Sequence, residues 1–219
     1  MIRGILFDLD GTLADSAPDL GWALNTLLDR YGRAPVSLER LRRRASQGAR
    51  GLLEEGFGVR PEDPYFEELR DAFLALYRDN LSRRTVLFEG VPELLDALDA
   101  RGLPWGIVTN KLARFTNPLV EALGLAARAA CVVSGDSYAR PKPYPDPLLG
   151  AAEELALAPA ELLYVGDDER DMVAAQAAGM DGIVARYGYL GEGAPPETWH
   201  ARGWIDHPRE LMAYLTHDA

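Results

Sequence analysis

The chain has 219 residues, of which 47% are hydrophobic and 26% charged, enough for one large folded domain or two unequal ones. Its formal net charge of -11 argues against general binding to nucleic acid or to an anionic membrane surface. No apolar run reaches membrane-spanning length, and a single cysteine, Cys131, excludes an intrachain disulfide. Because no signal-peptide pattern is present either, we expect a cytoplasmic protein.

The chain begins with an apolar run from Ile2 to Leu9 that predicts a buried strand ending near Asp8. Asp8 and Asp10 stand at its end, and Gly11 then permits an unusual turn. Open α/β sheets bind ligands at the carboxyl ends of their strands, so these carboxylates are candidate site residues. Taken alone, the Asp-Gly pair fits a surface turn equally well, and the downstream residues decide between the two interpretations.

Residues 17 to about 84 show helical periodicity and no convincing strand. This stretch is therefore an all-helical insert after the first strand, and its two crossings, Asp15–Ala17 and Leu81–Glu89, are candidate hinges. The predicted helices are Ala17–Tyr31, Arg40–Ala45, Ala49–Phe57 and Phe66–Leu81.

After the insert, strands and helices alternate, which implies βαβ crossovers and a parallel sheet. The predicted strands are Pro104–Thr109, Ala130–Ser134, Leu162–Gly166, Gly182–Ala185 and Trp204–Asp206, and the predicted helices are Glu93–Arg101, Ala113–Leu123, Asp146–Leu157, Arg170–Ala178 and Pro208–Leu215. We therefore predict an α/β fold: a doubly wound, Rossmann-like parallel sheet core over residues 1–15 and 86–219, with a helical domain over residues 16–85 inserted into it.

Polar residues follow four of the predicted strands, at the points where the strands end, and in a parallel sheet these ends converge on one edge. Three or more carboxylates cannot share a small site without a cation, because their mutual repulsion is too large. Oxygen ligands favour Mg²⁺, and the lack of His and Cys in these segments disfavours zinc. The residues are Asp8 and Asp10, then Thr109 and Asn110, then Lys142, and finally Asp167, Asp168 and Asp171.

This set of side chains suits transfer of a phosphoryl group. Asp8 can attack phosphorus and form an acyl phosphate. Asp10 can give a proton to the leaving oxygen and later take one from water. Mg²⁺ and Lys142 would neutralise the charge of the phosphate, and Thr109 adds a hydroxyl and free backbone N–H groups.

The same residues resemble the four motifs of the haloacid dehalogenase superfamily, in the same order. The resemblance covers nearly the whole chain, and the helical domain resembles the small α-helical cap of that superfamily. The matching segments are Asp8-Leu9-Asp10-Gly11-Thr12, Val108-Thr109-Asn110, Lys142-Pro143, and Gly166-Asp167-Asp168 with Asp171.

The resemblance implies a role for each matching residue. Asp8 would be the nucleophile and Asp10 the acid and base. Thr109, Asn110 and Lys142 would bind the phosphate.

It also implies a Mg²⁺ site, held by Asp167 together with Asp8 and the carbonyl oxygen of Asp10. Asp168 or Asp171 would support the metal, through water or by fixing Lys142, and the resemblance leaves open which of the two does so. Behind the ligands would stand Thr12, Asp168 and Asp171.

Within the superfamily the chain is similar to bacterial phosphoglycolate phosphatases and to a close branch, the N-acetylmuramic acid 6-phosphate phosphatases. The implied function is Mg²⁺-dependent hydrolysis of a small phosphoester that carries a carboxylate, by a monomer or homodimer. A sugar phosphomutase shares all four motifs, and a non-catalytic scaffold on the same fold is a further alternative. A dehalogenase is disfavoured because its reaction does not need an acid at Asp10.

A cluster of arginines in the helical domain, Arg40, Arg42, Arg43, Arg44 and Arg50, reads mainly as a solvated helix face. We also consider that Arg43 or Arg50 binds the substrate carboxylate, since the overall charge of the chain is wrong for an anionic ligand. The segment Ser46-Gln47-Gly48 would then close over the site. His200, His207 and His217 lie in polar or proline-flanked surroundings and are not expected to be catalytic.

Overall fold

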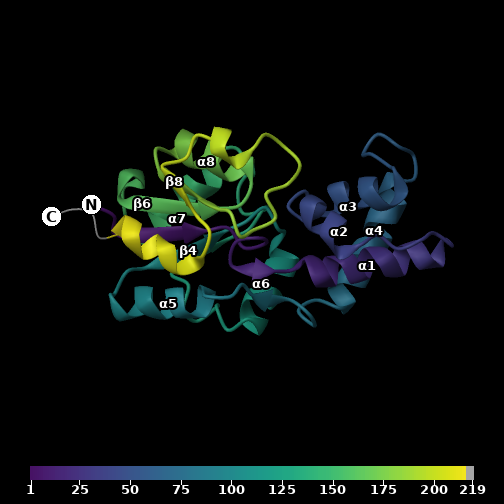
Figure 1. Ribbon diagram of the computed structural model, residues 1–219, viewed down its shortest axis with the longest axis horizontal. Coiled ribbons are helices and arrows are strands. Elements are labelled where there is room, and N and C mark those ends of the chain that lie inside the picture. Colours follow the sequence, from purple (N-terminus) through teal and green to yellow (C-terminus); the bar gives the residue numbers. More distant parts are fainter. Residues whose placement is uncertain (216–219) are drawn as a thin grey trace.

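A six-stranded parallel sheet forms the centre of the larger unit of the computed structural model, which describes residues 1–215 (Figure 1). The strand order is β5-β4-β1-β6-β7-β8. The strands are β1 (Gly4–Phe7), β4 (Trp105–Val108), β5 (Val132–Val133), β6 (Leu162–Gly166), β7 (Asp181–Ala185) and β8 (Gly203–Ile205). Because β1 is fully buried between β4 and β6, the residues that follow it stand at the middle of the sheet's carboxyl edge.

Helices cover both faces of this sheet, because successive side chains of a strand point to opposite faces and both sets are apolar here. Ile5 and Phe7 pack into the cluster that contains the buried side chains of α5 and α6. Leu6 packs on the other face with side chains of α7 and α8. These helices are α5 (Val91–Ala100), α6 (Ala113–Ala122), α7 (Asp146–Leu155) and α8 (Glu169–Ala178). The predicted doubly wound fold is confirmed.

Four helices form a second unit beside the sheet (Figure 1). They are α1 (Ala17–Arg30), α2 (Leu38–Ala45), α3 (Gly48–Phe57) and α4 (Phe66–Asp79). Their buried side chains, among them Leu24, Leu52 and Phe73, form a hydrophobic cluster that Phe115 and Tyr189 join from the sheet unit. We propose that the helical insert expected over residues 16–85 is a separate structural unit, called the cap below.

The two crossings between the cap and the sheet are hydrogen-bonded to each other. β2 (Ala14–Asp15) pairs antiparallel with β3 (Val86–Leu87), and Phe88 N donates to Leu13 O at 3.0 Å. The sequence predicted hinges at these crossings but no strands, since a strand of two residues has no periodicity to detect.

A buried carboxylate fixes the second crossing to the first cap helix. Asp19 of α1 is 0% exposed and accepts hydrogen bonds from Asn80 Nδ2 at 3.2 Å and from Arg84 N at 2.9 Å. Thr85 donates to it twice, from its backbone N at 2.9 Å and its Oγ1 at 2.8 Å. A carboxylate inside a protein needs such donors, so this network holds the segment after α4 in place.

The other predicted elements agree with the observed ones to within a few residues, and one differs in type. Pro208–Leu215 forms a 3-10 helix, η3. The spacing of apolar residues does not distinguish a 3-10 helix from an α-helix, so the sequence did not predict its type. Two shorter 3-10 turns are η1 (Pro159–Glu161) and η2 (Pro196–Thr198). Within residues 1–215, no helix has the length and continuous apolarity that a membrane span requires. His200 is exposed and His207 partly buried, while His217 lies outside the described residues.

Candidate active site

The loop after β1 carries Asp8 and Asp10, and its shape depends on glycine. The Leu9 carbonyl oxygen accepts a hydrogen bond from Ala14 N at 2.9 Å, which closes the turn. Gly11 has a φ of +90°, and a Cβ at that position would overlap the carboxylate of Asp167. The loop therefore lies directly against Asp167, which follows β6.

Asp167 is fully buried and held by two donors. Its Oδ1 accepts from Thr12 Oγ1 at 3.1 Å, and its Oδ2 accepts from Tyr189 N at 2.8 Å. Burial raises the pKa of the Asp167 carboxyl well above its usual range, and the carboxylates of Asp8 and Asp171 raise it further. Thr12, predicted to stand behind the ligands, thus orients the Asp167 side chain.

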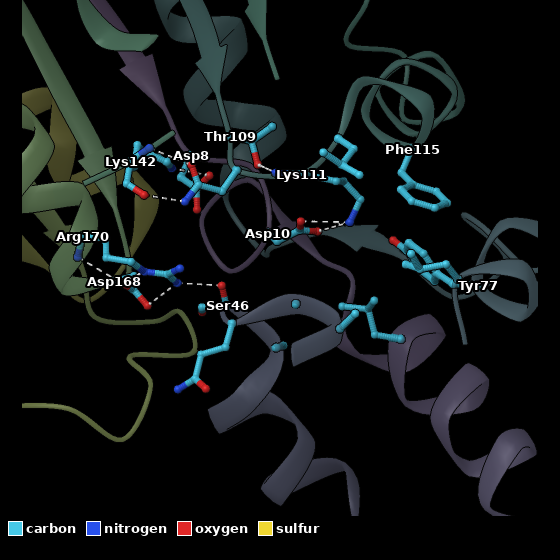
Figure 2. Close-up of a pocket in the computed structure, with 18 of the residues that line it drawn as sticks. Asp8, Asp10, Ser46, Tyr77, Thr109, Lys111, Phe115, Lys142, Asp168 and Arg170 are labelled. Atoms are coloured by element: carbon cyan, nitrogen blue, oxygen red, sulfur yellow. Dashed lines mark hydrogen bonds and ion pairs between the residues drawn. The ribbon is translucent and has the colours of Figure 1, made fainter. Parts of the chain in front are cut away.

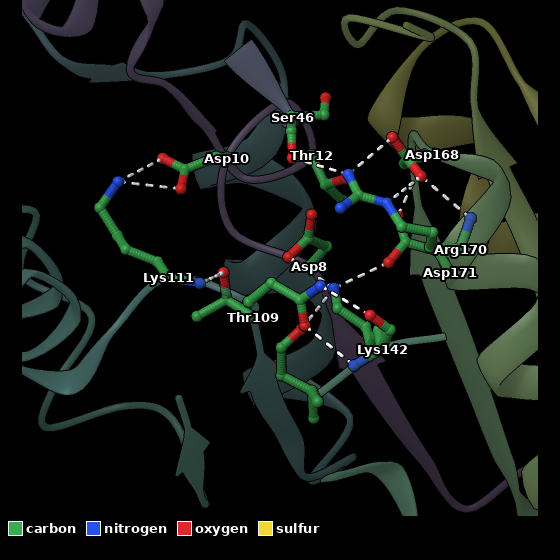
Figure 3. A network of polar contacts seen from close by, with 12 residues as sticks. Asp8, Asp10, Thr12, Ser46, Thr109, Lys111, Lys142, Asp168, Arg170 and Asp171 are labelled. Atoms are coloured by element: carbon green, nitrogen blue, oxygen red, sulfur yellow. Dashed lines mark hydrogen bonds and ion pairs between the residues drawn. The ribbon is translucent and has the colours of Figure 1, made fainter. Parts of the chain in front are cut away.

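Lys142 lies in the loop after β5, and its ammonium contacts the aspartates of two different motifs (Figure 3). Its Nζ donates to Val108 O at 3.0 Å, to Tyr164 Oη at 2.7 Å and to Asp171 Oδ1 at 2.7 Å. These bonds use its three protons, so Asp8 Oδ1, only 2.9 Å from Nζ, is buried without a hydrogen bond. Burial opposes the charge, but Asp171 and Asp8 outweigh it and raise the pKa of Lys142.

The acidic cluster fits the predicted Mg²⁺. Buried Asp8, Asp167 and Asp171 each offer a carboxylate oxygen, and these oxygens lie within 4.8 Å of one another. Burial raises the pKa of Asp8 to about 6, against the opposing effect of Lys142. An all-oxygen donor set with an unpartnered carboxylate oxygen suits a hard divalent cation.

The two aspartates left open by the sequence have different neighbours. Asp171 is 1% exposed, pairs with Lys142 and accepts from Asp168 N at 3.0 Å. Asp168 caps α8 by accepting from Arg170 N at 2.9 Å and also binds the Arg170 guanidinium, at 2.7 and 2.9 Å. Burial of Asp168 opposes its ionisation, but the hydrogen bonds from Arg170 keep its pKa below the usual range. Asp171 is therefore the residue that fixes Lys142.

Thr109 and Asn110 follow β4 and border the same cavity as Lys142. Asn110 clamps the backbone of Lys142: its Nδ2 donates to Lys142 O at 2.9 Å, and Lys142 N donates to its Oδ1 at 3.0 Å. Thr109 Oγ1 accepts from Lys111 N at 3.2 Å. The phosphate-binding roles expected for both residues stay predictions, and the contacts of Asn110 give it a positioning role.

Lys111 is a site residue that sequence reasoning missed. Its Nζ lies 3.0 and 2.9 Å from the two carboxylate oxygens of Asp10, and its side chain is 7% exposed (Figure 2). Ser16 Oγ donates a short hydrogen bond to the same carboxylate. Burial opposes the charge, but Asp10 and Tyr77 together raise the pKa of Lys111 above its usual range. No spacing rule could have identified this pair, because its members are far apart in the sequence.

One cavity of about 280 Å³ connects these groups to the cap (Figure 2). The sheet side supplies charged and polar groups, while the cap side is largely apolar. Tyr77 of α4 belongs to this wall: it is 1% exposed, its Oη has no hydrogen-bond partner, and burial raises its pKa to about 12. The apolar side chains of the cap that line the cavity are Leu20, Ala45, Ala49, Phe73 and Leu74, and Leu112 and Phe115 line it from the sheet unit.

The arginines considered for carboxylate binding do not line this cavity. Arg43 pairs with Glu39 at 3.0 Å on an exposed helix face, and Arg50 is exposed. Gly48 does line the cavity, together with Ser46 and Gln47. The structure therefore places the expected closing segment at the site, without a contact between the cavity and either arginine.

Two other arginines line the cavity, and neither was predicted to be a site residue. Arg170 Nη2 donates to Ser46 O at 2.6 Å, which joins the start of α8 to the turn between α2 and α3. Arg70 extends from α4 and donates to Glu67 at 2.8 Å. Both positions depend on how the cap approaches the sheet, which local patterns do not report.

Comparisons with known proteins agree with this geometry. The family model described as haloacid dehalogenase-like hydrolase matches residues 5–185. The chain is 39% identical over 214 residues to the N-acetylmuramic acid 6-phosphate phosphatase of Pseudomonas aeruginosa, covering 98% of this chain and 95% of the relative. It is 40% identical over 209 residues to the phosphoglycolate phosphatase of Xanthomonas campestris, covering 95% and 94%. A crystal structure of a predicted phosphoglycolate phosphatase from Haemophilus somnus superposes with a TM-score of 0.86 at 26% identity, covering 98% of each chain.

Proposed function

This chain belongs to the haloacid dehalogenase-like hydrolase family, and on that premise we propose that it hydrolyses small phosphomonoesters that carry a carboxylate, through a phosphorylated Asp8. One observation carries the proposal. Asp8, Lys142 and the pair Asp167 and Asp171 come from three separate segments of the chain and meet at one place, where Asp8, Lys142 and Asp171 line the cavity. Burying several acidic groups beside a buried lysine ammonium costs desolvation free energy. Such an arrangement is therefore typical of binding or catalytic sites.

In the proposed reaction Asp8 is the nucleophile. The ionised carboxylate is the attacking form, and Lys142 Nζ, 2.9 Å from Oδ1, favours that form. Attack forms a bond from Asp8 to phosphorus and breaks the bond to the ester oxygen. Asp10 then supplies the proton that the leaving oxygen needs, and it later takes a proton from the water that hydrolyses the acyl phosphate.

The phosphate would be held at the end of β4 and by Lys142. Thr109 lines the cavity and offers its hydroxyl, and Lys142 offers a positive charge beside Asp8. Asn110 is proposed to act mainly through Lys142, since its amide already binds the backbone of that residue at both ends.

Asp8, Asp167 and the carbonyl oxygen of Asp10 are proposed to hold Mg²⁺, with Asp171 next to them. When bound, Mg²⁺ supplies positive charge that offsets the charge of the phosphoryl group. The raised pKa values of Asp8 and Asp167 support this proposal, because a cation removes the cost of keeping several buried carboxylates ionised.

Two substrate candidates remain, and each has an observation in its favour. A short phosphorylated acid, as in phosphoglycolate phosphatases, fits the two lysine ammonium groups of the cavity, those of Lys111 and Lys142, which lie near the proposed ester position. A phosphorylated amino-sugar acid fits the apolar cap wall and the cavity of about 280 Å³, close to the lower end of pockets that enclose drug-sized ligands, roughly 300–1,000 Å³. A phosphomutase would transfer the phosphate from Asp8 to a second sugar hydroxyl instead of to water. A scaffold without activity would never form the Asp8 phosphate.

Phosphate release from 2-phosphoglycolate and from N-acetylmuramic acid 6-phosphate, each with and without Mg²⁺, tests the proposal. We expect Mg²⁺-dependent release from at least one of them. Transfer of phosphate to a second sugar hydroxyl would favour a mutase, and no turnover of either ester would contradict the proposal. We also propose that the protein is cytoplasmic and acts as a monomer or homodimer. The free, buried thiol of Cys131 is compatible with a reducing compartment.

A further inference from the structure

Two groups that line the cavity have no role in the chemistry proposed above: the Lys111 ammonium and the Tyr77 hydroxyl. Lys111 comes from the sheet unit and Tyr77 from α4 of the cap, and Lys111 Nζ lies 4.9 Å from the centre of the Tyr77 ring. Tyr77 Oη is buried without a hydrogen-bond partner, and Figure 2 shows it turned towards Lys111 and Asp10. A buried hydroxyl without an acceptor is costly and calls for an explanation, such as a ligand that supplies the acceptor.

We propose that Lys111 Nζ and Tyr77 Oη bind the carboxylate of the substrate, beside the ester oxygen that leaves. The inference rests on the proposed phosphatase function and names the part of the site that selects the leaving group. The carboxylate-binding role considered for Arg43 or Arg50 is thus assigned to Lys111 of the sheet unit and Tyr77 of the cap.

The position of Lys111 relative to Asp10 supports this assignment. A general acid reaches the leaving oxygen over one hydrogen bond, about 2.6–3.2 Å. Lys111 Nζ is 2.9 Å from Asp10 Oδ2, so the ammonium stands within roughly 6 Å of the ester oxygen. A carboxylate on the carbon next to that oxygen falls into this gap.

The bonding capacity of Lys111 points the same way. Its ammonium has three protons, and two of them meet the oxygens of Asp10, which leaves one N–H for a ligand. Lys142, by contrast, uses all three protons within the protein. The two arginines that line the cavity are also engaged: Arg170 is held by Asp168 and by Ser46 O, and Arg70 by Glu67 and Asp71.

The surroundings strengthen an ion pair at this position. Phe73 and Phe115 stand beside Tyr77 in the cavity wall, and both are at least 95% buried, at 0% and 5% exposure. Charges attract more strongly where such side chains exclude water. A neutral leaving group would leave the third Lys111 proton and the Tyr77 hydroxyl without acceptors, so the site should discriminate against it.

The test compares 2-phosphoglycolate with 2-hydroxyethyl phosphate, which carries a neutral hydroxymethyl group in place of the carboxylate, and with p-nitrophenyl phosphate as a general measure of phosphatase chemistry. The variants are Lys111→Met, Lys111→Arg and Tyr77→Phe. Arg114→Met is the control, because Arg114 is an exposed cation of the neighbouring helix that does not line the cavity. The readout is the ratio of kcat/KM for the acid to that for the neutral ester, which cancels any loss common to all substrates.

We expect the wild type to prefer the acid. Lys111→Met should lower the ratio about tenfold to one-hundredfold, mainly through KM, and Tyr77→Phe about threefold to tenfold, as expected for charge-assisted and neutral hydrogen bonds. Lys111→Arg should recover part of the ratio, and Arg114→Met should leave it unchanged.

An equal loss on the acid and the neutral ester, or a wild type without preference, would overturn the inference while leaving the phosphatase proposal intact. Failure of the wild type to hydrolyse these three esters and N-acetylmuramic acid 6-phosphate would instead reject the proposed function, and the inference with it. Turnover of N-acetylmuramic acid 6-phosphate alone would overturn the inference and leave the proposed function standing, because the carboxylate of that ester is not next to the leaving oxygen. If Lys111→Met does not fold, the ratios of Lys111→Arg and Tyr77→Phe decide.

Discussion

Asp171 Oδ1 lies 2.7 Å from Lys142 Nζ, so the start of α8 sets the position of a cation that also stands 2.9 Å from Asp8. The pair is buried, with side chains 3% and 2% exposed, and it is therefore little screened by solvent. Asp171 thus sets the position of the charge beside the proposed nucleophile.

The first prediction concerns this pair. Asp171→Asn removes the countercharge that holds Lys142, and we expect kcat to fall about 10- to 100-fold, the usual range for residues that orient a site. Asp168→Asn is the matched variant, since Asp168 caps the same helix but pairs with Arg170. We expect a smaller loss from it, measured by steady-state kinetics on the same phosphoester; the reverse order would contradict the role given to Asp171.

The second prediction concerns the loop after β1. Gly11→Ala places a methyl group where the Asp167 carboxylate lies, and it also strains a backbone with a φ of +90°. Gly124→Ala is its control, because Gly124 has a φ of +72° but open space around it. Denaturant unfolding should show about 1–2 kcal/mol of destabilisation for Gly124→Ala, from left-handed strain. Gly11→Ala should lose more stability and nearly all activity; equal effects would mean that the contact with Asp167 is unimportant.

The third prediction concerns Mg²⁺ and pH. The pKa of Asp8 is about 6 in the metal-free fold and 3.8 normally, so ionised Asp8 destabilises that fold. This cost is absent where Asp8 is protonated in both states, grows as pH rises from about 4 to 6, and is fully present above about pH 7. Because a cation removes it, Mg²⁺ should raise Tm more at about pH 8 than at about pH 5.

Thermal unfolding with Mg²⁺ or with a chelator at both pH values measures this difference. In Asp8→Asn the dependence of the Mg²⁺ effect on pH should be reduced, since the titrating carboxyl is gone. A Mg²⁺ effect that is larger at the lower pH would contradict the assignment of Asp8 as a ligand.

The fourth prediction concerns the attachment of the cap. Asp19→Ala removes the acceptor for the donors of Asn80, Arg84 and Thr85, and we expect about 3 kcal/mol of destabilisation, because several buried donors lose their partner. Asp29→Ala on the exposed part of the same helix is the control and should change stability by about 0.5 kcal/mol or less. Equal unfolding midpoints for the two variants would show that the network does not hold the cap.

Much of the fold could be predicted because its signals are local. The apolar run before Asp8, the helical spacing in the cap and the alternation of strands and helices after it each depend on neighbouring residues, and they lead to the observed sheet. The short ribbon of β2 and β3 was missed because two residues carry no period.

The candidate site could be predicted only where its residues follow strands. Asp8, Lys142 and Asp167 stand at the carboxyl edge, and the topology alone brings such positions together. The contact of Lys111 with Asp10 was missed because the strand pattern does not fix the directions of side chains in the loops after the strands. The contact of Lys111 with Tyr77 was missed because it depends on where the cap meets the sheet. The same holds for the arginines of the cap, whose direction on the helix surface no sequence spacing reveals.

The central claim is that phosphate is transferred to Asp8. The most direct measurement is to quench the enzyme in acid during turnover, reduce any acyl phosphate with borohydride, and locate the modified residue by peptide mass spectrometry. We predict reduction of the side chain at position 8, dependent on substrate and Mg²⁺ and absent from Asp8→Asn. Modification at another carboxylate, or steady turnover by Asp8→Asn without any modified residue, would contradict the account.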